Sequence, residues 1–324
     1  MYSFIHVNAG TLADAAITLG QGKAAIIAGG TDLLPYMKGM CSPNPPTTLV
    51  NIKTITPGLN YIKVDGGTLK IGALTSLADI AASSMVVGGW NVLALAAKAA
   101  ASPEVRNIGT IGGNICQKPR CLYFRNEMNA FNCLRKTTGG VCYALPGVNT
   151  YHSIFGAVGG CIAVCPSDIA PALVALSVSI VTSKKTWTAA DFFVIKGEQI
   201  NSIDADEIVT EIQVPALATG AKSTYLKFAF RKAVDFPLVS CAAVITQVAS
   251  SVSAASIVLG GVYNSPKRAV DAERYIAGKV INTDTADAAG IATAAIATTT
   301  ALPTNKYKVQ IAKTLIKRAL LANA

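Results

Sequence analysis

The chain has 324 residues, a formal net charge of +10, 51% hydrophobic residues and only 14% charged residues. The low charge and a mean hydropathy of +0.43 exclude a disordered chain, and the length suggests two or three packed units. The longest stretch without a charge, 236–266, is broken by Ser, Thr and Gln well short of the ~20 apolar residues that a membrane span needs. We therefore expect a globular protein with no membrane span.

The charge and the cysteines narrow the class of protein further. Lys and Arg are scattered, with no basic run interleaved with aromatics, so nucleic-acid binding is not indicated, and we interpret the positive charge as a docking or anion-attracting surface. Residues 1–10 lack the pattern of a targeting segment, and we expect a cytoplasmic protein. Disulfides are not expected in the reducing cytoplasm. Six of the eight cysteines fall between Cys116 and Cys165, and this clustering indicates a metal site.

In the first hundred residues, local patterns predict alternating helices and strands. Thr11 is placed to cap the first helix, and the turn Asp65-Gly66-Gly67 joins two apolar runs as a hairpin. The predicted elements are helix 11–19, strands 24–27 and 49–52, the hairpin 61–64 with 69–71, and helices 77–82 and 92–101.

The remainder predicts a separate C-terminal unit. A Pro- and Gly-containing stretch, 215–222, reads as a linker, and the strands that follow it precede helical material, so this unit is expected to be α+β. The predicted elements are helix 169–176, strands 224–230, 240–248 and 255–262, and a helix within 286–301.

The first candidate binding segment follows the strand 24–27. Gly29 and Gly30 would let the backbone approach an anion closely, and the Thr31 hydroxyl could add a donor. The alternative is a tight strand-to-helix turn with Asp32 as a helix cap.

A second Gly-Thr segment, 107–114, lies far along the chain and is predicted to be a loop. Neither segment has the G-x-G-x-x-G or the P-loop pattern, so neither of those nucleotide sites is supported. Two separate loops suit one long ligand between two subdomains, and a dinucleotide such as FAD fits this description. The alternative is two unrelated turns.

The cysteine-rich stretch contains no tight C-x-x-C unit of the kind that zinc sites use. Four thiolates from a long irregular loop could hold an iron–sulfur cube, for which six cysteines compete. Buried free cysteines are the alternative, preferred for Cys41 and Cys241. The basic residues nearby would favour thiolates and offset the charge of a cluster; they are Lys118, Arg120, Arg125, Arg135 and Lys136.

Other polar residues offer little catalytic chemistry. Ser167 and Asp168 precede a predicted helix, either as its N-cap or as a ribose contact. His6 and His152 are the only histidines, and no Ser/His/Asp set can be assembled from them. We predict no catalytic residue.

Four motifs occur in a fixed order: AGGTDLLP at 28–35, TIGGNICQKPRC at 110–121, CPSDIAPALVAL at 165–176 and YLKFAFRKAVDFPLVSCAAV at 225–244. With them, the chain resembles the FAD-binding medium subunits of the xanthine dehydrogenase family of molybdenum hydroxylases. The resemblance implies an α+β protein with a two-subdomain FAD-binding fold of the vanillyl-alcohol-oxidase (PCMH) type. It places the FAD-binding domain at 1–220, with subdomains at about 1–55 and 56–220, and an α+β C-terminal domain at 221–324.

The resemblance also implies which residues bind the flavin. The first loop, the second loop and the Ser-Asp pair map directly onto the family motifs, and two further positions in later strands map less directly. The implied set is Ala28, Gly29, Gly30, Thr31, Asp32, Leu33, Thr110, Gly112, Gly113, Asn114, Ser167, Asp168, Val209 and Lys227.

Most family members join the second Gly loop almost directly to the Ser-Asp helix, whereas this chain inserts residues 115–162. The insertion resembles a subset with an extra [4Fe-4S] cluster, typified by the medium subunits of 4-hydroxybenzoyl-CoA reductase and of periplasmic-type aldehyde oxidoreductases. The cysteine pattern of that subset maps onto Cys121, Cys133, Cys142 and Cys161. Cys116 precedes the first ligand, and the pattern does not require Cys165.

The implied function is that of an electron-transfer flavoprotein subunit. Electrons would pass between a molybdenum cofactor on a large subunit, two [2Fe-2S] clusters on a small subunit, this FAD and the extra cluster, with ferredoxin or NAD as a possible carrier. The complex would act on an aromatic acyl-CoA, an aldehyde or an N-heterocycle. The alternatives are a stand-alone FAD oxidase of the related fold, and a cysteine-cluster binding module without redox chemistry.

Overall fold

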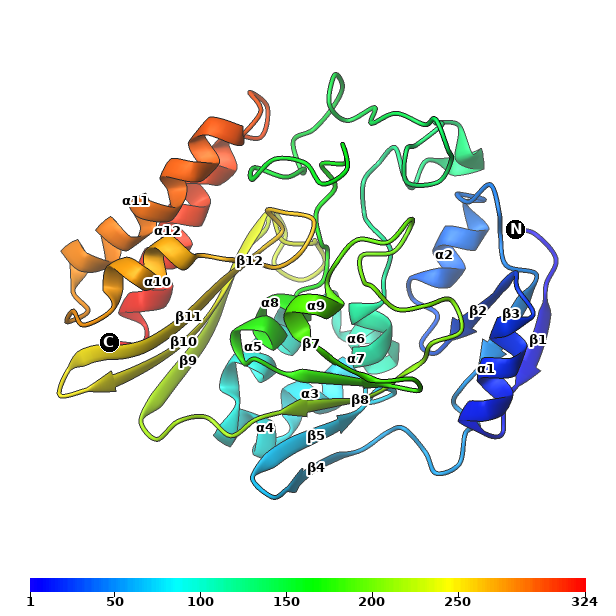
Figure 1. Ribbon diagram of the computed structural model, residues 1–324, viewed down its shortest axis with the longest axis horizontal. Coiled ribbons are helices and arrows are strands. Elements are labelled where there is room, and N and C mark those ends of the chain that lie inside the picture. The colour runs from blue at the N-terminus through cyan, green and yellow to red at the C-terminus, as the bar shows by residue number, and fades with distance from the viewer.

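The computed structural model describes residues 1–324 as three β-sheets with helices packed against them (Figure 1). The first sheet is parallel, with strand order β1-β3-β2. Its elements are β1 (Ile5–Asn8), α1 (Leu12–Gly20), β2 (Ala24–Ile27), α2 (Leu33–Lys38) and β3 (Thr48–Asn51).

The first helix forms for the reason that its sequence indicates. The Thr11 hydroxyl accepts from the Asp14 N–H at 3.1 Å, and the Asp14 carboxylate accepts from the Thr11 N–H at 3.1 Å. This reciprocal capping box satisfies two backbone donors, while Ala15 and Leu19 are buried in the small core beside the sheet. The predicted helix and its N-cap are confirmed, but strand β1, which is largely exposed, was not predicted.

The second sheet has five strands in the order β4-β5-β8-β6-β7, all pairs antiparallel. Gly66 and Gly67 join β4 to β5 with φ of 56° and 79°, as a two-residue hairpin turn requires, and the predicted hairpin is confirmed. The strands are β4 (Ile62–Asp65), β5 (Thr68–Gly72), β6 (Ser179–Thr182), β7 (Thr186–Thr188) and β8 (Val209–Val214).

Helices cover this sheet and build the largest apolar core of the protein. Those predicted at 77–82, 92–101 and 169–176 are confirmed to within a few residues. The helices are α3 (Leu77–Ala82), α4 (Ser84–Gly89), α5 (Asn91–Ala99), α6 (Pro103–Ile108), α7 (Ile111–Ile115), α8 (Ile169–Ala175) and α9 (Ala189–Phe192).

The prediction of a loop at 107–114 is wrong, because α6 and α7 occupy most of this segment. Thr110 caps α7 by accepting from the Gly113 N–H at 3.1 Å. Two glycines disfavour such a helix, but Ile111 and Ile115 are fully buried, and tertiary packing therefore outweighs the low helix propensity.

The C-terminal unit is an antiparallel sheet in the order β12-β11-β10-β9, with three helices against one face (Figure 1). The predicted strands and the helix near 286–301 are confirmed, but the expected linker is shorter, since Ala221 and Lys222 already pair with β10. The elements are β9 (Ala221–Phe228), β10 (Val239–Val248), β11 (Ser251–Gly260), β12 (Lys267–Arg268), α10 (Val270–Ile276), α11 (Thr283–Thr300) and α12 (Tyr307–Leu321).

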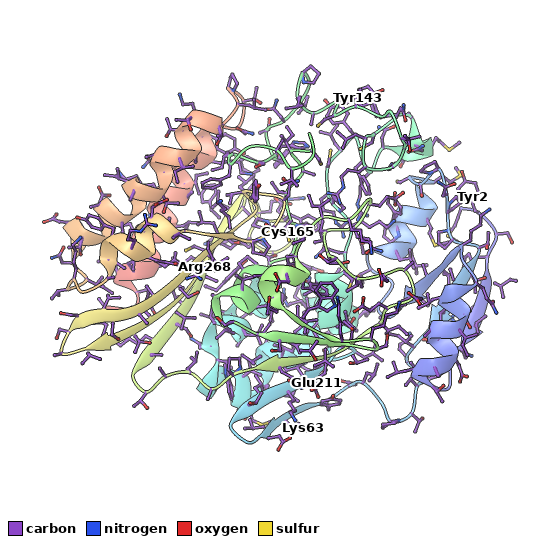
Figure 2. All side chains as sticks on the ribbon, viewed as in Figure 1. Tyr2, Lys63, Tyr143, Cys165, Glu211 and Arg268 are labelled. Atoms are coloured by element: carbon purple, nitrogen blue, oxygen red, sulfur yellow. The ribbon has the colours of Figure 1, made fainter.

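The cysteine-rich segment between α7 and α8 is irregular apart from one short 3-10 turn, Glu127–Asn129. It arches along one edge of the molecule, from the α2 side to the turn between α11 and α12 (Figure 1). Tyr143 lies at its outer edge, whereas Cys165, just before α8, lies in the interior and is 2% exposed (Figure 2).

The C-terminal unit fixes this segment through a buried lysine. Lys308 of α12 is fully buried, and its ammonium donates to the carbonyl oxygens of Gly261 at 2.5 Å, His152 at 3.0 Å and Tyr151 at 3.3 Å. Burial lowers the pKa of Lys308 to about 7. The hydrogen bonds to the three carbonyl groups oppose this effect, because they favour the ammonium form.

We expect Lys308→Met to lower the free energy of unfolding by more than about 2 kcal/mol, since it leaves buried carbonyl groups without a donor. Lys306→Met, two residues earlier at an exposed position, is the control and should change stability by less than about 0.5 kcal/mol. Urea unfolding measures both variants, and equal stabilities would contradict the assigned role of Lys308.

None of the helices combines the length and the apolar composition that a membrane-spanning helix requires.

Candidate functional site

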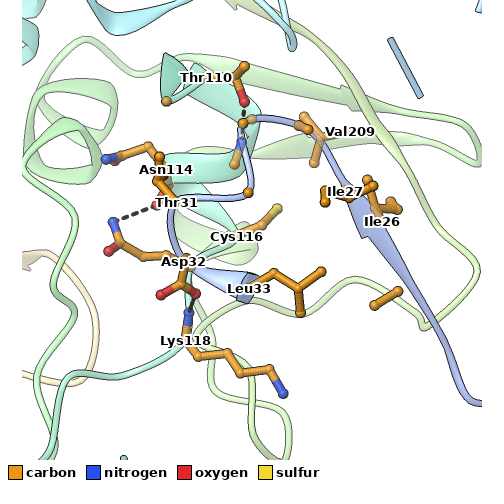
Figure 3. Close-up of a pocket in the computed structure, with 18 of the residues that line it drawn as sticks. Ile26, Ile27, Thr31, Asp32, Leu33, Thr110, Asn114, Cys116, Lys118 and Val209 are labelled. Carbon is orange, nitrogen blue, oxygen red and sulfur yellow. Dashed lines mark hydrogen bonds between the residues drawn. The ribbon is translucent and has the colours of Figure 1, made fainter. Parts of the chain in front are cut away.

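A cavity of about 540 Å³ lies between the N-terminal sheet and the helices of the five-stranded sheet (Figure 3). The end of β2, the α6–α7 junction, the start of α8 and the start of β8 all contribute to its wall. The volume falls in the range of about 300–1,000 Å³ that is typical of sites for small molecules and cofactors.

The two glycine segments meet at this cavity, and their glycines allow them to touch. A Cβ on Gly29 would stand 2.9 Å from the Ile108 carbonyl carbon and closer still to its oxygen. Gly30 has a φ of 71°, which disfavours other residues. A Cβ on Gly112 would stand 2.9 Å from the Ala73 carbonyl oxygen. Gly29 and Gly112 therefore make room for neighbouring backbone.

Asp32 lines the cavity but does not cap α2, and the cap that the sequence suggests is absent. Its carboxylate accepts from the Lys118 N–H at 2.9 Å (Figure 3). It also pairs with Arg120 at 2.6 Å and with Arg125 at 2.5 Å. Asp32 thus ties the cysteine-rich segment to the first glycine loop, and two of the basic residues expected near the thiols are directed at this carboxylate.

The two residues of the Ser-Asp pair, Ser167 and Asp168, have different roles: Ser167 caps helix α8, and Asp168 lines the cavity. Ser167 Oγ accepts from the Ala170 N–H at 3.0 Å, as a helix cap does, and donates to Asn114 Oδ1 at 2.5 Å. Asp168 accepts from the Tyr225 hydroxyl at 2.6 Å. Of the residues that the resemblance implies for FAD, all line the cavity except Ser167 and Lys227, which stand behind the wall.

Asp168 and Lys227 form a buried ion pair at 2.8 Å, with side chains that are 4% and 8% exposed. Burial raises the pKa of the Asp168 carboxyl, and the Lys227 ammonium and the Tyr225 hydroxyl act to lower it. The pair links β9 of the C-terminal unit to the start of α8.

Lys227→Met would leave the Asp168 carboxylate buried without its cation. We expect the free energy of unfolding to fall by about 3–5 kcal/mol, with part of the loss restored in the double variant Lys227→Met/Asp168→Asn. Lys232→Met, at an exposed position, is the control. Chemical denaturation checks the series, and a Lys227→Met variant as stable as the control would refute the role of the pair.

Sequence reasoning missed two polar residues of the wall. Gln199 and Asn201 lie between α9 and β8, and their side-chain oxygens, Oε1 and Oδ1, are buried without a hydrogen-bond partner. Such acceptors suit the hydroxyl or N–H groups of a bound ligand. No motif marks this segment, and only its fold brings it to the cavity.

The four cysteines that the sequence selects all lie on the irregular segment between α7 and α8. Burial raises the pKa of Cys133, and the nearby thiols of Cys161 and Cys142 raise it further. Burial likewise raises the pKa of Cys121 to about 11, and Cys133 and Cys161 add to the rise. Cys142 and Cys121 are partly exposed, and Cys133 and Cys161 are buried.

The backbone around these thiols provides hydrogen-bond donors to sulfur. Cys161 Sγ accepts from the Ala163 N–H at 3.4 Å. The nearby backbone N–H groups of Tyr123 and Phe124 act to lower the pKa of Cys121, against the effect of burial. Donors of this kind surround iron–sulfur thiolates, so the donor set fits such a cluster. No three His, Cys, Asp or Glu side chains lie close enough together to hold a single metal ion.

The remaining cysteines have other surroundings. Cys116 lines the cavity, and burial raises its pKa to about 12. Cys165 and Cys241 are buried in the two main apolar cores. Cys41 Sγ lies 3.2 Å from the Arg125 carbonyl oxygen, to which it donates.

A small apolar group connects the cavity to the thiols. Tyr36 lines the cavity and stacks on Phe124 with ring centroids 5.6 Å apart. Both rings pack with Cys41 and Cys133, and Cys121 contacts the same group. Lys136 lies over the Phe124 ring at 4.8 Å, so a cation also borders this bridge.

Comparison with known proteins matches both halves of the chain. Residues 2–217 match the family model of the FAD binding domain in molybdopterin dehydrogenase, and residues 224–323 match the CO dehydrogenase flavoprotein C-terminal domain. The chain is 34% identical over 285 residues to the aldehyde oxidoreductase FAD-binding subunit PaoB of Escherichia coli K12, an alignment that covers 84% of this chain and 86% of that one.

Carbon monoxide dehydrogenase of Hydrogenophaga pseudoflava gives both a sequence and a structural match. Its medium chain is 29% identical over 320 residues, covering 96% of this chain and 94% of that one. In the solved structure of that enzyme, the matching chain superposes with a TM-score of 0.76 at 28% identity, covering 99% of this chain and 97% of that chain. The expected fold, an FAD-binding domain followed by a flavoprotein C-terminal domain, is confirmed.

Proposed function

The chain belongs to the medium FAD-binding subunits of the molybdenum hydroxylase family, and on this basis we propose that it relays electrons through FAD and one [4Fe-4S] cluster. The observation that carries the proposal is that the cavity and the cysteine-rich segment are in contact through packed aromatic side chains. A cofactor-sized cavity, lined by both glycine segments, connects through the Tyr36–Phe124 stack to Cys133 and Cys121, two of the four selected cysteines.

We assign the cavity to FAD, which supplies one- and two-electron redox chemistry when bound. The backbone at Gly29, which closely approaches Ile108, shapes one part of the cavity wall, and Asp168, paired with Lys227, shapes another. Gln199 and Asn201 supply unpaired acceptors. We place the FAD-binding domain at 1–220 and the second domain at 221–324, in keeping with the gap between the two family matches.

We assign the cluster to Cys121, Cys133, Cys142 and Cys161. The thiols of Cys133 and Cys161 influence the pKa of Cys121, those of Cys142 and Cys161 influence the pKa of Cys133, and the Ala163 N–H donates to the sulfur of Cys161. Burial of Cys133 and Cys161 would exclude water from two corners of the cluster. The cluster, when bound, supplies one-electron transfer beside the flavin.

The relay needs partners, because a flavin and a cluster that pass electrons require a donor and an acceptor outside this chain. Neither of the two histidines lines the cavity. We propose a large subunit with the molybdenum cofactor, a small subunit with two [2Fe-2S] clusters, and ferredoxin or NAD as a possible carrier. Relatives with names such as carbon monoxide dehydrogenase medium chain support the multi-subunit assembly. The complex would act on an aldehyde, an N-heterocycle or an aromatic acyl-CoA.

Affinity purification of the tagged chain from its native source tests the relay. Both partner subunits should copurify, and the complex should oxidise an aldehyde or an N-heterocycle or act on an acyl-CoA, whereas the isolated chain should show no turnover with any of them. A monomeric chain that oxidises such substrates unaided would replace the relay with a stand-alone FAD oxidase.

A further inference from the structure

The proposed cluster site has one histidine at its edge. His152 is 3% exposed, and its Nε2 lies 3.2 Å from Cys121 Sγ. Its Nδ1 is buried and has no hydrogen-bond partner. The ring therefore directs its polar contact at the sulfur, although His152 lies 31 residues beyond Cys121 in the chain.

We propose that His152 donates a hydrogen bond from Nε2 to the Cys121 thiolate and thereby raises the reduction potential of the cluster; this inference rests on the cluster assignment made above. A donor at a ligand sulfur stabilises the reduced form more than the oxidised form, because the reduced cluster carries one more negative charge. Nε2 can donate either in the imidazolium or in the Nε2–H tautomer, so the role needs no particular charge on the ring.

The C-terminal unit holds the histidine in this position. The Lys308 ammonium donates to the His152 carbonyl oxygen at 3.0 Å, and the Asn305 amide donates to the Ser153 carbonyl oxygen at 3.0 Å. Ser153 also donates its N–H to Ile162 across the segment at 2.9 Å. The backbone on both sides of the ring is thus fixed to buried partners, which keeps Nε2 within reach of the sulfur.

His152 also distinguishes Cys121 from the other three ligands. The sulfur of Cys161 accepts from the backbone N–H of Ala163. His152 is the side-chain donor of the set. A residue that fixes one sulfur without binding iron is a positioning residue, and its removal should move the potential while leaving the cluster in place.

The full-length chain with ¹⁵N-labelled histidine allows a direct test, because it contains only two histidines and His6 lies exposed on β1. Pulsed electron paramagnetic resonance of the reduced cluster should show a weak ¹⁵N coupling. The coupling should disappear in His152→Gln and persist in His6→Gln. No coupling in the wild type would overturn the proposal, and so would a strong coupling typical of a nitrogen bound directly to iron.

Redox titration of His152→Leu supplies the second readout. We expect iron and sulfide as in the wild type and a more negative midpoint potential, with about a tenfold change in the ratio of reduced to oxidised cluster, equivalent to ~59 mV. His152→Gln keeps an N–H donor and should shift less. An unchanged potential in a fully loaded His152→Leu would refute the hydrogen bond. A wild-type chain without iron and sulfide would instead refute the cluster assignment itself. If His152→Leu does not fold, the labelling experiment on the wild-type chain tests the hydrogen bond in its place.

Discussion

Cys133→Ser should lose nearly all of its iron and acid-labile sulfide. Cys133 is 7% exposed and packs against Tyr36, Cys41 and Phe124, so the cluster cannot replace the missing thiolate with water from bulk solvent. A hydroxyl is a far weaker ligand for iron than a thiolate, and we expect the affinity to fall by more than the about 100-fold that loss of a supporting residue costs. Iron and sulfide analysis after desalting measures the loss.

Cys41→Ser is the matched control, because Cys41 belongs to the same apolar group but donates to the Arg125 carbonyl oxygen. Cys241→Ser, in the core of the C-terminal unit, is a distant control. Both should retain iron and sulfide. Equal loss in Cys41→Ser and Cys133→Ser would show a packing effect in place of ligation, and zinc at one per chain without sulfide would refute the cluster.

Gly29→Ala should yield a chain with little or no FAD. A methyl group at this position collides with the Ile108 carbonyl group, which belongs to backbone and cannot rotate aside as a side chain would. The first glycine loop must then withdraw from the α6–α7 junction, and the cavity loses the wall on which both segments meet. The ratio of flavin absorbance to protein in the purified chain measures the effect.

Gly58→Ala serves as the control for this substitution, since a Cβ on Gly58 meets no atom within 4 Å. Gly30→Val tests the same loop by a different route, because the φ of 71° strains a β-branched residue. Full flavin content in both Gly29→Ala and Gly30→Val would contradict the assignment of FAD to this cavity.

Local sequence patterns predicted the parts of the fold that depend on neighbouring residues. The N-cap at Thr11 and the hairpin turn at Gly66 and Gly67 depend on contacts within a few positions, and both are confirmed. Local patterns gave no strand at 209–214, where only the resemblance placed Val209 in a strand, because β8 is recognisable only once it pairs with β5 and β6 from distant parts of the chain. The helix α7 was missed for a related reason, since its stability comes from burial of Ile111 and Ile115.

The same distinction applies to the candidate site: the sequence indicated residues with a special backbone or polar role, but not their partners from distant parts of the chain. The glycine pattern pointed to close approach, but the sequence does not show that Ile108 is the group approached by Gly29. Asp32 looked like a helix cap, whereas its partners Arg120 and Arg125 lie 88 and 93 residues further along the chain. His152 looked isolated for the same reason. Its contact with Cys121 joins positions 31 residues apart, and Lys308 of α12 holds the His152 backbone.

The cofactor content of the full-length wild-type chain, purified without oxygen, is the most direct test of the electron-relay account. Flavin, iron and acid-labile sulfide measured on one sample should approach about one FAD, four iron and four sulfide per chain. Flavin without iron and sulfide would contradict the cluster assignment, and a colourless chain with neither cofactor would contradict the relay as a whole.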